Sequence, residues 1–416
     1  MPQTSFPHKI WKVQNGIPIC GRDEALKPSL FVEWLDEAME GAEGAESKHI
    51  IRFTNRHDFG ACLEQWNLMK KSLPRLNGIQ PLKIISAFSC ALASISKLAS
   101  VPFIQSIETD SKMSVHTSKI VSAVQPAGKK ASSGRIGGVP WGISHIRAPQ
   151  AWGKSKGDRI RIGVIDTGAD YTHPDLRHCL SYGVNLLNRH LMPNDDNGHG
   201  THIAGTIAAS GRQRGINGVA PQAIIHPVKA FDHQGSAFVS DIIGGIDWCV
   251  RNQLHIINMS FGMKTYSKAL ETAIRNAYHA GVIVVASSGN EGKQATIDYP
   301  ARLRQVIAVG ATTRRGKVAP FSNSSKKIDI YAPGEKIYST WLRGKYHELS
   351  GTSMATSHVT GVIALMLSRK PGLKPMQVKS IIKKNAKLLI RTGISIKEIH
   401  ALRAVGALSK LSPTDN

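Results

Sequence analysis

The stretch GTSMATSHVTGVIALMLSRKP, residues 351–371, begins with small polar residues and continues as a long apolar run. A buried helix does not need a Gly-Thr-Ser start, and a surface helix would not be apolar over most of its length. One explanation is that Ser353 stands at the positive end of a buried helix because its oxygen takes part in a reaction. A serine hydroxyl is a weak nucleophile on its own. This interpretation therefore requires a base and an acid elsewhere in the chain.

Composition describes an ordinary globular protein of one or two domains. The chain has 416 residues, of which 41% are hydrophobic and 20% are charged. Its net charge of +24 is unevenly distributed: residues 1–116 hold 13 Lys+Arg and 12 Asp+Glu, and the remainder holds 40 and 17. A basic surface can attract anionic polymers or membranes, although solubility is the commoner meaning. The asymmetry indicates two regions of different character.

The cysteines and the N-terminus bear on the compartment. An odd number of cysteines without regular spacing does not fit a disulfide framework or a zinc site, so we expect reduced, mostly buried thiols. They are Cys20, Cys62, Cys90, Cys179 and Cys249. The N-terminus lacks the basic start and apolar core of a secretory signal. Polar residues interrupt the apolar run 82–104, so no transmembrane helix is expected.

From residue 159 onward, short apolar runs alternate with segments of helical pattern. The runs are rich in Val and Ile, and they cover residues 159–166, 223–231, 255–262, 281–289, 306–312 and 328–334. Helices are expected over 238–252 and 266–281. Strands that are apolar on both faces and alternate with helices indicate a three-layer α/β/α fold with a central, mostly parallel sheet. In such a sheet, reactive groups gather at the carboxyl ends of the strands.

The regions flanking this pattern read differently. HIIRF (49–53) and the runs that follow it up to residue 110 predict a small α+β domain over 48–116. Residues 117–138 are dense in Ser, Gly and Lys, which is typical of a flexible, exposed linker. MQVKSIIKKNAKLLIR (376–391) predicts a last helix docked on the core, with a membrane-surface helix as the alternative.

The acid and the base that Ser353 requires are both present. Asp166 ends the first strong strand, in VIDTGAD, and His199 follows 33 residues later in NGHGTHIAGTIAAS. A lone aspartate in a turn is usually a local cap, and a lone histidine usually has a structural role. All three residues at strand–helix junctions, in the order Asp, His, Ser, favour a catalytic triad, because this order is one of the few known for that chemistry.

Five blocks of the sequence resemble the signature blocks of the subtilisin-like serine proteases, or subtilases. They are VIDTGADYTHPDL, NGHGTHIAGTIAA, INMSFG, SSGNEG and GTSMATSH, and the resemblance covers about residues 139–370. It implies a subtilisin-like serine endopeptidase that works through an acyl-enzyme. Asp166 would orient His199, and His199 would act as base and then acid on the nucleophile Ser353. Asn290 and the backbone N–H of Ser353 would form the oxyanion hole.

The resemblance also implies where substrate binds. Backbone that pairs with the substrate as an added strand would come from Gly235, Ser236, Ser260 and Gly262. An apolar subsite would be lined by Val239, Ile242 and Phe261. The primary pocket would be formed by Ser287 and Gly289, with Glu291 at its rim and Asp298 where many relatives have a small residue. Two carboxylates there would favour Lys or Arg before the scissile bond, unless Asp298 pairs with Arg302 or Arg304.

Two departures from the family pattern concern a helix start and a metal. Family members usually carry Pro where this chain has Ser357, so we expect a slightly different helix start and unchanged chemistry. Many relatives bind calcium through the residue matching Asp175 and a loop in which Arg212 here replaces Asn. A guanidinium supplies no oxygen ligand, so calcium binding is doubtful, and Arg212 pairing with Asp175 is a hypothesis. No cofactor is expected for the chemistry.

The N-terminal region resembles a subtilase pro-domain, which assists folding and inhibits the enzyme until it is cut. FIQSIETD (103–110) resembles the strand that closes such a domain, ahead of a tail that occupies the substrate groove. We therefore expect an extension over 1–47, a ferredoxin-like pro-domain over 48–116, a linker over 117–138 and a catalytic domain over 139–416. Cleavage is expected within the linker 117–138, near His116, or after Lys130 or Arg135 if the primary pocket selects basic residues.

Partners and compartment follow from these readings. We expect peptide and protein substrates, the pro-domain as intramolecular inhibitor, and a monomer. The absence of a visible signal and the unpaired cysteines favour an intracellular protein, whereas a pro-domain usually accompanies secretion. A competing hypothesis is a catalytically silent protein that binds nucleic acid or another anionic polymer, and a third is a protease tethered by its charge. Basic patches interleaved with aromatic residues, typical of nucleic-acid binding, are missing from the sequence.

Overall fold

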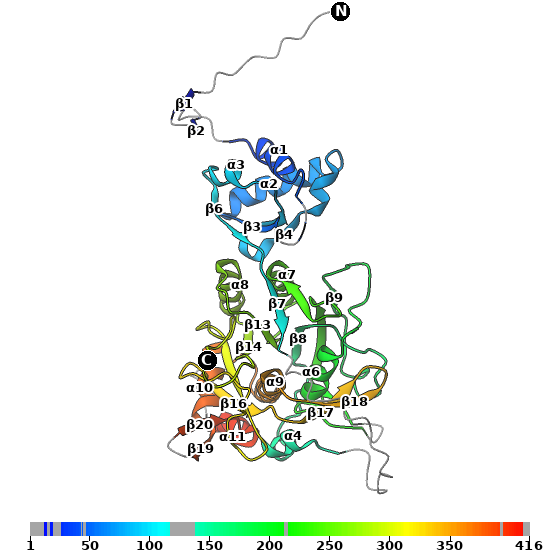
Figure 1. Ribbon diagram of the computed structural model, residues 1–416. Coiled ribbons are helices and arrows are strands. Elements are labelled where there is room, and N and C mark those ends of the chain that lie inside the picture. Colours follow the sequence, from blue (N-terminus) through cyan, green and yellow to red (C-terminus); the bar gives the residue numbers. More distant parts are fainter. Residues whose placement is uncertain are drawn as a thin grey trace, which may run out of the picture.

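The computed structural model describes the backbone of residues 12–14, 17–19, 26–42, 44, 47–116, 138–211, 215–391 and 394–410. These residues form a small N-terminal domain above a large domain, and one strand, β7 (Lys112–Val115), runs down from the first into the second (Figure 1). A separate short hairpin, β1 (Lys12–Gln14) and β2 (Ile17–Ile19), precedes both domains.

The large domain is built on a nine-stranded sheet that is parallel except at one edge. In spatial order its strands are β19 (Lys387–Arg391), β20 (Ile394–Glu398), β16 (Ile330–Pro333), β15 (Ile307–Thr312), β14 (Ile283–Ser287), β12 (Ile256–Met259), β8 (Arg161–Asp166), β10 (Ile224–Lys229) and β9 (Val184–Asn185). Only the edge pair β19–β20 is antiparallel. The central strands are buried along nearly their whole length, which is why they read as continuous apolar runs.

Helices cover both faces of this sheet, and the expected three-layer α/β/α fold is confirmed. Side chains of alternate parity along each strand belong to two separate cores, since Ile162 and Val164 face one layer and Ile165 faces the other. One layer consists of α7 (Val239–Arg251) and α8 (Lys268–His279). The other contains α4 (Trp141–His145), α5 (Ala148–Ala151), α6 (His199–Ala208), α9 (Thr352–Arg369), α10 (Pro375–Lys384) and α11 (Ala401–Ala407). A hairpin of β17 (Ile337–Trp341) and β18 (Lys345–Leu349) packs beside α6.

The N-terminal domain is a four-stranded antiparallel sheet with helices on it. Its elements are α1 (Pro28–Ala38), β3 (Lys48–Phe53), α2 (Arg56–Met69), β4 (Gln80–Leu82), β5 (Ala87–Ala91), α3 (Ser96–Ala99) and β6 (Ile104–Thr109), and the strand order is β4-β5-β3-β6. Contacts between aromatic rings, such as Phe53 against Phe31 and Phe88, fill its core. Helix α1 lies within the segment expected to be an extension, yet Phe31 and Leu35 are fully buried in this same core.

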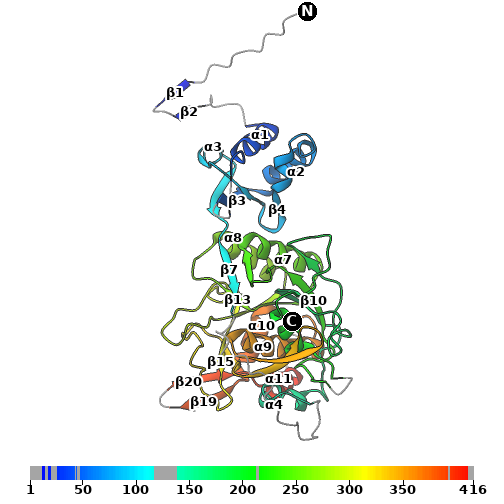
Figure 2. The ribbon, with the colours of Figure 1, turned by 45° about the vertical axis from the view of Figure 1, so that its right-hand side comes forward.

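The small domain rests on the two helices that cover one face of the large sheet (Figure 2). Two of its carboxylates bond to the first turns of those helices. Glu108 accepts hydrogen bonds from the hydroxyl of Ser267 at 2.6 Å and from the backbone N–H of Ala269 at 3.1 Å, at the start of α8. Asp110 accepts from the backbone N–H of Ser240 at 2.9 Å, at the start of α7. Helix N-termini favour negative charge, so these contacts hold the domains together.

One expectation for the C-terminal region needs correction. The segment 376–391 is not one helix, because α10 ends at Lys384 and the chain continues as the edge strand β19. Pairing with β20 satisfies backbone groups that a longer helix would have carried, and α11 is instead the last α-helix among the described residues. The run LKIISAF (82–88) is interrupted by a 3-10 turn, where Ser86 adopts a positive φ of 51°.

Four of the cysteines are free and buried: Cys62, Cys90, Cys179 and Cys249. Burial raises the thiol pKa of Cys62, Cys90 and Cys179 to about 12, so these thiols are unreactive at neutral pH. Cys20 lies outside the described residues. Within the described ranges, every helix is too short or too polar to cross a bilayer.

Candidate active site

Asp166 and His199 meet at the carboxyl edge of the sheet. Asp166 is the last residue of β8, and His199 is the first residue of α6. The Nδ1 atom of His199 lies 2.7 Å from Oδ1 of Asp166, and both side chains are at least 99% buried. A carboxylate only accepts, so Nδ1 carries a proton, and in the neutral ring Nε2 keeps a free lone pair. Nε2 has no hydrogen-bond partner among the described residues.

The turn that presents His199 depends on a glycine. Gly198 has a φ of +110°, and a Cβ at this position would come within 2.4 Å of the Trp341 ring. Only glycine adopts this conformation without strain, and only glycine leaves room for the indole. This close approach explains why a glycine directly precedes His199 at the start of α6.

Ser353 is the second residue of α9, and it is fully buried in this form of the chain. Its hydroxyl donates to the backbone carbonyl of Ser260 at 2.9 Å and lies 3.3 Å from the carbonyl oxygen of His116. Helix α9 packs against α6, the helix that begins with His199. At the position where relatives carry Pro, Ser357 donates its hydroxyl to the carbonyl of Ser353 at 3.0 Å. The helix continues without a break from Thr352 to Arg369.

Asn290 points its amide at the same carbonyl. Its Nδ2 atom donates to the His116 carbonyl oxygen at 2.9 Å. Its own oxygen is held by both the backbone N–H and the hydroxyl of Thr352, each at 2.9 Å. These two bonds fix which end of the amide faces His116, so the donor is oriented before any reaction occurs.

Residues 112–116 run as an added strand between the segments that are expected to pair with substrate. Strand β7 is the central strand of a three-stranded antiparallel sheet, between β11 (Ser236–Phe238) and β13 (Phe261–Gly262). The backbone of Gly235, Ser236, Ser260 and Gly262, expected to pair with substrate, pairs or bonds with this segment. Met113 belongs to the same buried cluster as Val239, Ile242 and Phe261, the expected lining of the apolar subsite.

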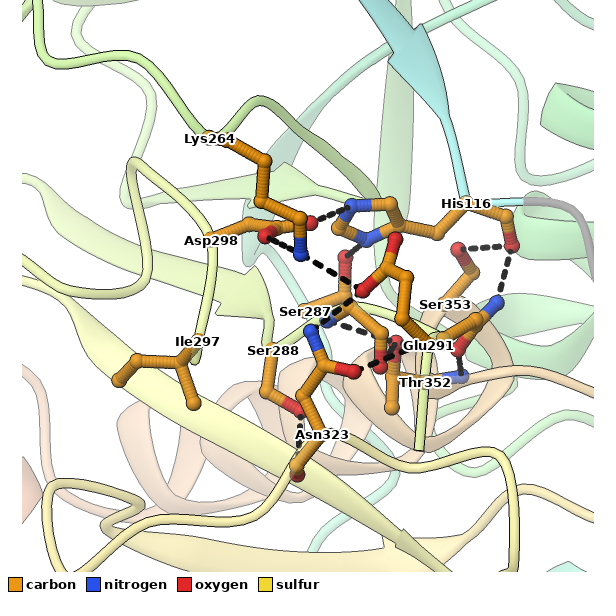
Figure 3. Close-up of polar contacts among 12 residues, drawn as sticks. His116, Lys264, Ser287, Ser288, Glu291, Ile297, Asp298, Asn323, Thr352 and Ser353 are labelled. Carbon is orange, nitrogen blue, oxygen red and sulfur yellow. Dashed lines mark hydrogen bonds and ion pairs between the residues drawn. The ribbon is translucent and has the colours of Figure 1, made fainter. Parts of the chain in front are cut away.

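The side chain of His116 fills the expected primary pocket (Figure 3). Its Nδ1 lies 2.7 Å from the Ser287 hydroxyl, and its Nε2 lies 2.9 Å from Oδ2 of Asp298. Burial tends to raise the pKa of Asp298, but hydrogen bonds and positive charge from His116 and Lys264 outweigh it and hold the pKa below its usual value. Asp298 is therefore a carboxylate at neutral pH.

Lys264 is the pocket residue that the sequence did not reveal. Its ammonium group bonds to Oδ1 of Asp298 and, at 2.8 Å, to Glu291. Arg302, one of the two expected partners of Asp298, donates its Nε to the carbonyl of Ile297 instead. Gly289 adopts a φ of +107°, and a Cβ there would meet Asn323 and Asp298. Nothing in the spacing of SFGMK marks its lysine as a pocket residue.

Asp175 is buried, and its two carboxylate oxygens differ in their partners. Its Oδ2 accepts hydrogen bonds from the Ile216 N–H and the Tyr346 hydroxyl, both at 2.8 Å, while Oδ1 has no described partner. Elsewhere in the described ranges, no three His, Cys, Asp or Glu side chains are grouped as metal ligands. The hypothesis that Arg212 pairs with Asp175 falls on residues outside the described ranges.

Comparisons with known proteins identify the sequences that this chain is similar to. The model of the subtilase family matches residues 157–407. Thermostable alkaline protease from Halalkalibacterium halodurans is 43% identical over 252 residues, which cover 60% of this chain and 69% of that protein. Subtilisin Savinase from Lederbergia lenta is 41% identical over 257 residues, 62% of this chain and 94% of that protein. Subtilisin E from Bacillus subtilis (strain 168) is 41% identical over 256 residues, 60% of this chain and 67% of that protein.

Proposed function

The chain belongs to the subtilase family, and on that premise we propose which of its residues perform the reaction. It is a subtilisin-like serine endopeptidase that hydrolyses peptide bonds through an Asp-His-Ser triad. We assign the triad to Asp166, His199 and Ser353, and the side-chain donor of the oxyanion hole to Asn290. The observation that carries this assignment is the carbonyl of His116, which lies against both the Asn290 amide and the Ser353 hydroxyl.

The proposed reaction starts with a change in the hydrogen-bond partner of the Ser353 hydroxyl. The hydroxyl turns from the Ser260 carbonyl to Nε2 of His199, which takes its proton as Oγ bonds to the substrate carbonyl carbon. The carbonyl π electrons move to oxygen, and Asn290 donates to the oxyanion. The intermediate collapses as His199 gives the proton to the leaving amine, and water then releases the acyl group by the same steps. These groups supply base, nucleophile and anion stabilisation, so no cofactor is needed.

We further propose that residues 26–116 form a pro-domain that inhibits the enzyme and is cut after His116. The support is that β7 fills the groove as a substrate would and ends with the His116 carbonyl in the proposed oxyanion hole. The other candidate cleavage points, Lys130 and Arg135, lie outside the described residues.

A serine-directed fluorophosphonate tests the proposed function. We expect it to label the processed chain at Ser353, and we expect no label on Ser353→Ala. Salt-sensitive retention on heparin by a chain that resists labelling would instead favour the silent, anion-binding protein.

A further inference from the structure

The imidazole of His116 is held by both of its ring nitrogens. Its side chain is 93% buried, and its two partners come from separate strands and loops of the large domain, Ser287 at the end of β14 and Asp298 in the loop beyond it. The two partner oxygens are therefore fixed by the fold rather than by the segment that they bind. The two partner oxygens suit an imidazole better than any other side chain, because each of its two ring nitrogens can bond to one of them.

One carboxylate oxygen in the pocket, Oδ2 of Asp298, is available to a donor from the bound segment. Lys264 bonds to one oxygen of Asp298 and to Glu291, so one cation lies between two carboxylates. Oδ2, the second oxygen of Asp298, faces His116. The Asp298 side chain is only 3% exposed, so this oxygen cannot be solvated freely once the groove is filled. A buried acceptor without a donor costs roughly 1–3 kcal/mol.

The pocket also limits the bulk that can enter beside Asp298. A Cβ on Gly262 would lie 2.7 Å from Cε1 and Nε2 of the imidazole and from Cβ of Asp298. The imidazole ring therefore lies directly over the backbone of β13, and it fits there because Gly262 has no side chain.

We propose that the primary pocket selects histidine before the scissile bond, with Asp298 as the residue that determines this specificity. The inference rests on the proposed function, because it names the substrate class of the same site. Phe or Leu would leave Oδ2 of Asp298 without a donor. Lys or Arg would bring a second long cation to a carboxylate whose other oxygen already holds Lys264.

Ser287 allows both protonation states of the histidine to make two hydrogen bonds in the pocket. The neutral ring with hydrogen on Nε2 donates to Asp298 and accepts from the serine hydroxyl at Nδ1. The imidazolium donates to both, because a hydroxyl oxygen is also an acceptor. Each form therefore makes two bonds in the pocket, and the charged form adds attraction to the carboxylates.

The test uses the processed enzyme and peptides that copy its own segment, Met-Ser-Val-X followed by a fluorogenic leaving group, with X as His, Phe, Leu, Lys or Arg. We expect kcat/KM for the histidine peptide to exceed each of the others at least about tenfold, because a site built to hydrogen-bond a group discriminates against analogues that lack it. In Asp298→Gly, kcat/KM for the histidine peptide should fall at least about tenfold, while kcat/KM for the Phe and Leu peptides should be retained. Ser287→Ala should reduce only the preference for histidine.

A matched control is Asp247→Asn, which removes another largely buried carboxylate paired with a cation, Arg251. It should leave the ranking of the five peptides by kcat/KM unchanged. Equal or faster cleavage of the Phe, Leu, Lys or Arg peptide by the unmodified enzyme would overturn the proposal, as would an unchanged order in Asp298→Gly. Fluorophosphonate labelling of the same samples separates the two claims. A labelled enzyme without the preference refutes the specificity alone, and absence of both labelling and cleavage refutes the proposed function with it.

Discussion

The carbonyl oxygen of His116 accepts a hydrogen bond from the side chain of Asn290 at 2.9 Å. The two residues come from different domains, and the contact places the peptide bond after His116 at the proposed nucleophile. The first prediction follows directly. N-terminal sequencing of the processed protein should begin at Thr117, and Ser353→Ala should remain a single uncut chain. A mature protein that begins at Ala131 or Ile136 would contradict the proposed processing site.

Asn290→Leu should slow the chemical step. Loss of the equivalent donor in a subtilisin costs about 10²–10³-fold in kcat, and we adopt that family value as the expected loss here. KM should change little, because the donor acts mainly on charge that develops in the transition state. Steady-state kinetics on a peptide substrate measure both quantities. An unchanged kcat would show that Asn290 is not the donor.

Glu108→Gln should weaken the attachment of the small N-terminal domain to the large domain. The carboxylate bonds to the hydroxyl of Ser267 and to backbone N–H groups in the first turn of α8, where negative charge is favoured. Losing such a charged contact costs on the order of 1 kcal/mol, which corresponds to roughly fivefold weaker binding. After cleavage, less of the N-terminal fragment should co-elute with the large domain on size exclusion. The exposed Glu64→Gln provides the control and should co-elute as before.

Asp241→Asn should change how stability depends on pH. Burial, with a further contribution from Asp110, raises the pKa of Asp241 to about 6 although Lys48 opposes the shift. An acid with a raised folded-state pKa keeps its proton in the folded chain between about pH 4 and 6, where the unfolded chain has lost it. Its charge therefore costs stability above about pH 6, and that cost disappears as the pH falls through this window.

The asparagine removes this charge. On an uncut Ser353→Ala background, thermal unfolding should show a gain of about 1–3 kcal/mol at pH 7–8 that shrinks toward pH 4. The exposed Glu33→Gln should show no comparable gain. A gain of equal size at pH 4 and pH 8 would mean that packing, and not ionisation, is responsible.

Chelation should leave the melting temperature unchanged. Asp175 already uses Oδ2 for two protein donors, and calcium needs several oxygen ligands. Thermal unfolding in EDTA and in millimolar calcium should coincide, and calorimetric titration should give no tight binding. A calcium-dependent rise of several degrees would show that residues outside the described ranges complete a site.

The sequence predicts the chemistry of this protein better than its specificity. Asp166, His199 and Ser353 each lie in a block with a strong local signal, a strand end or a helix start, so their roles could be inferred one by one. The apolar runs likewise identify the central strands, because strands buried on both faces carry little else. Lys264 has no such signal: its importance depends on a loop that brings it to Asp298 from 34 residues away. The position of His116 depends on how two domains dock.

The C-terminal misassignment has a similar origin. Residues 387–391 have apolar spacing that suits a helix as well as a strand, and the edge of the sheet decides between the two. Helix α1 was missed as part of the small domain because its apolar residues, such as Phe31, find their partners only in the folded core.

Strand β7 has a neighbour on each side, and this has a consequence for timing. If the chain is cut after residue 116 as proposed, the cut removes none of these backbone hydrogen bonds, so residues 112–116 would stay paired with the large domain and block the newly cut enzyme. Cleavage after His116 and the start of activity on other substrates would then be separate events, with a delay between them. A freshly cut preparation would then show a lag followed by accelerating activity, because each molecule that releases its N-terminal fragment can degrade the fragments bound to other molecules.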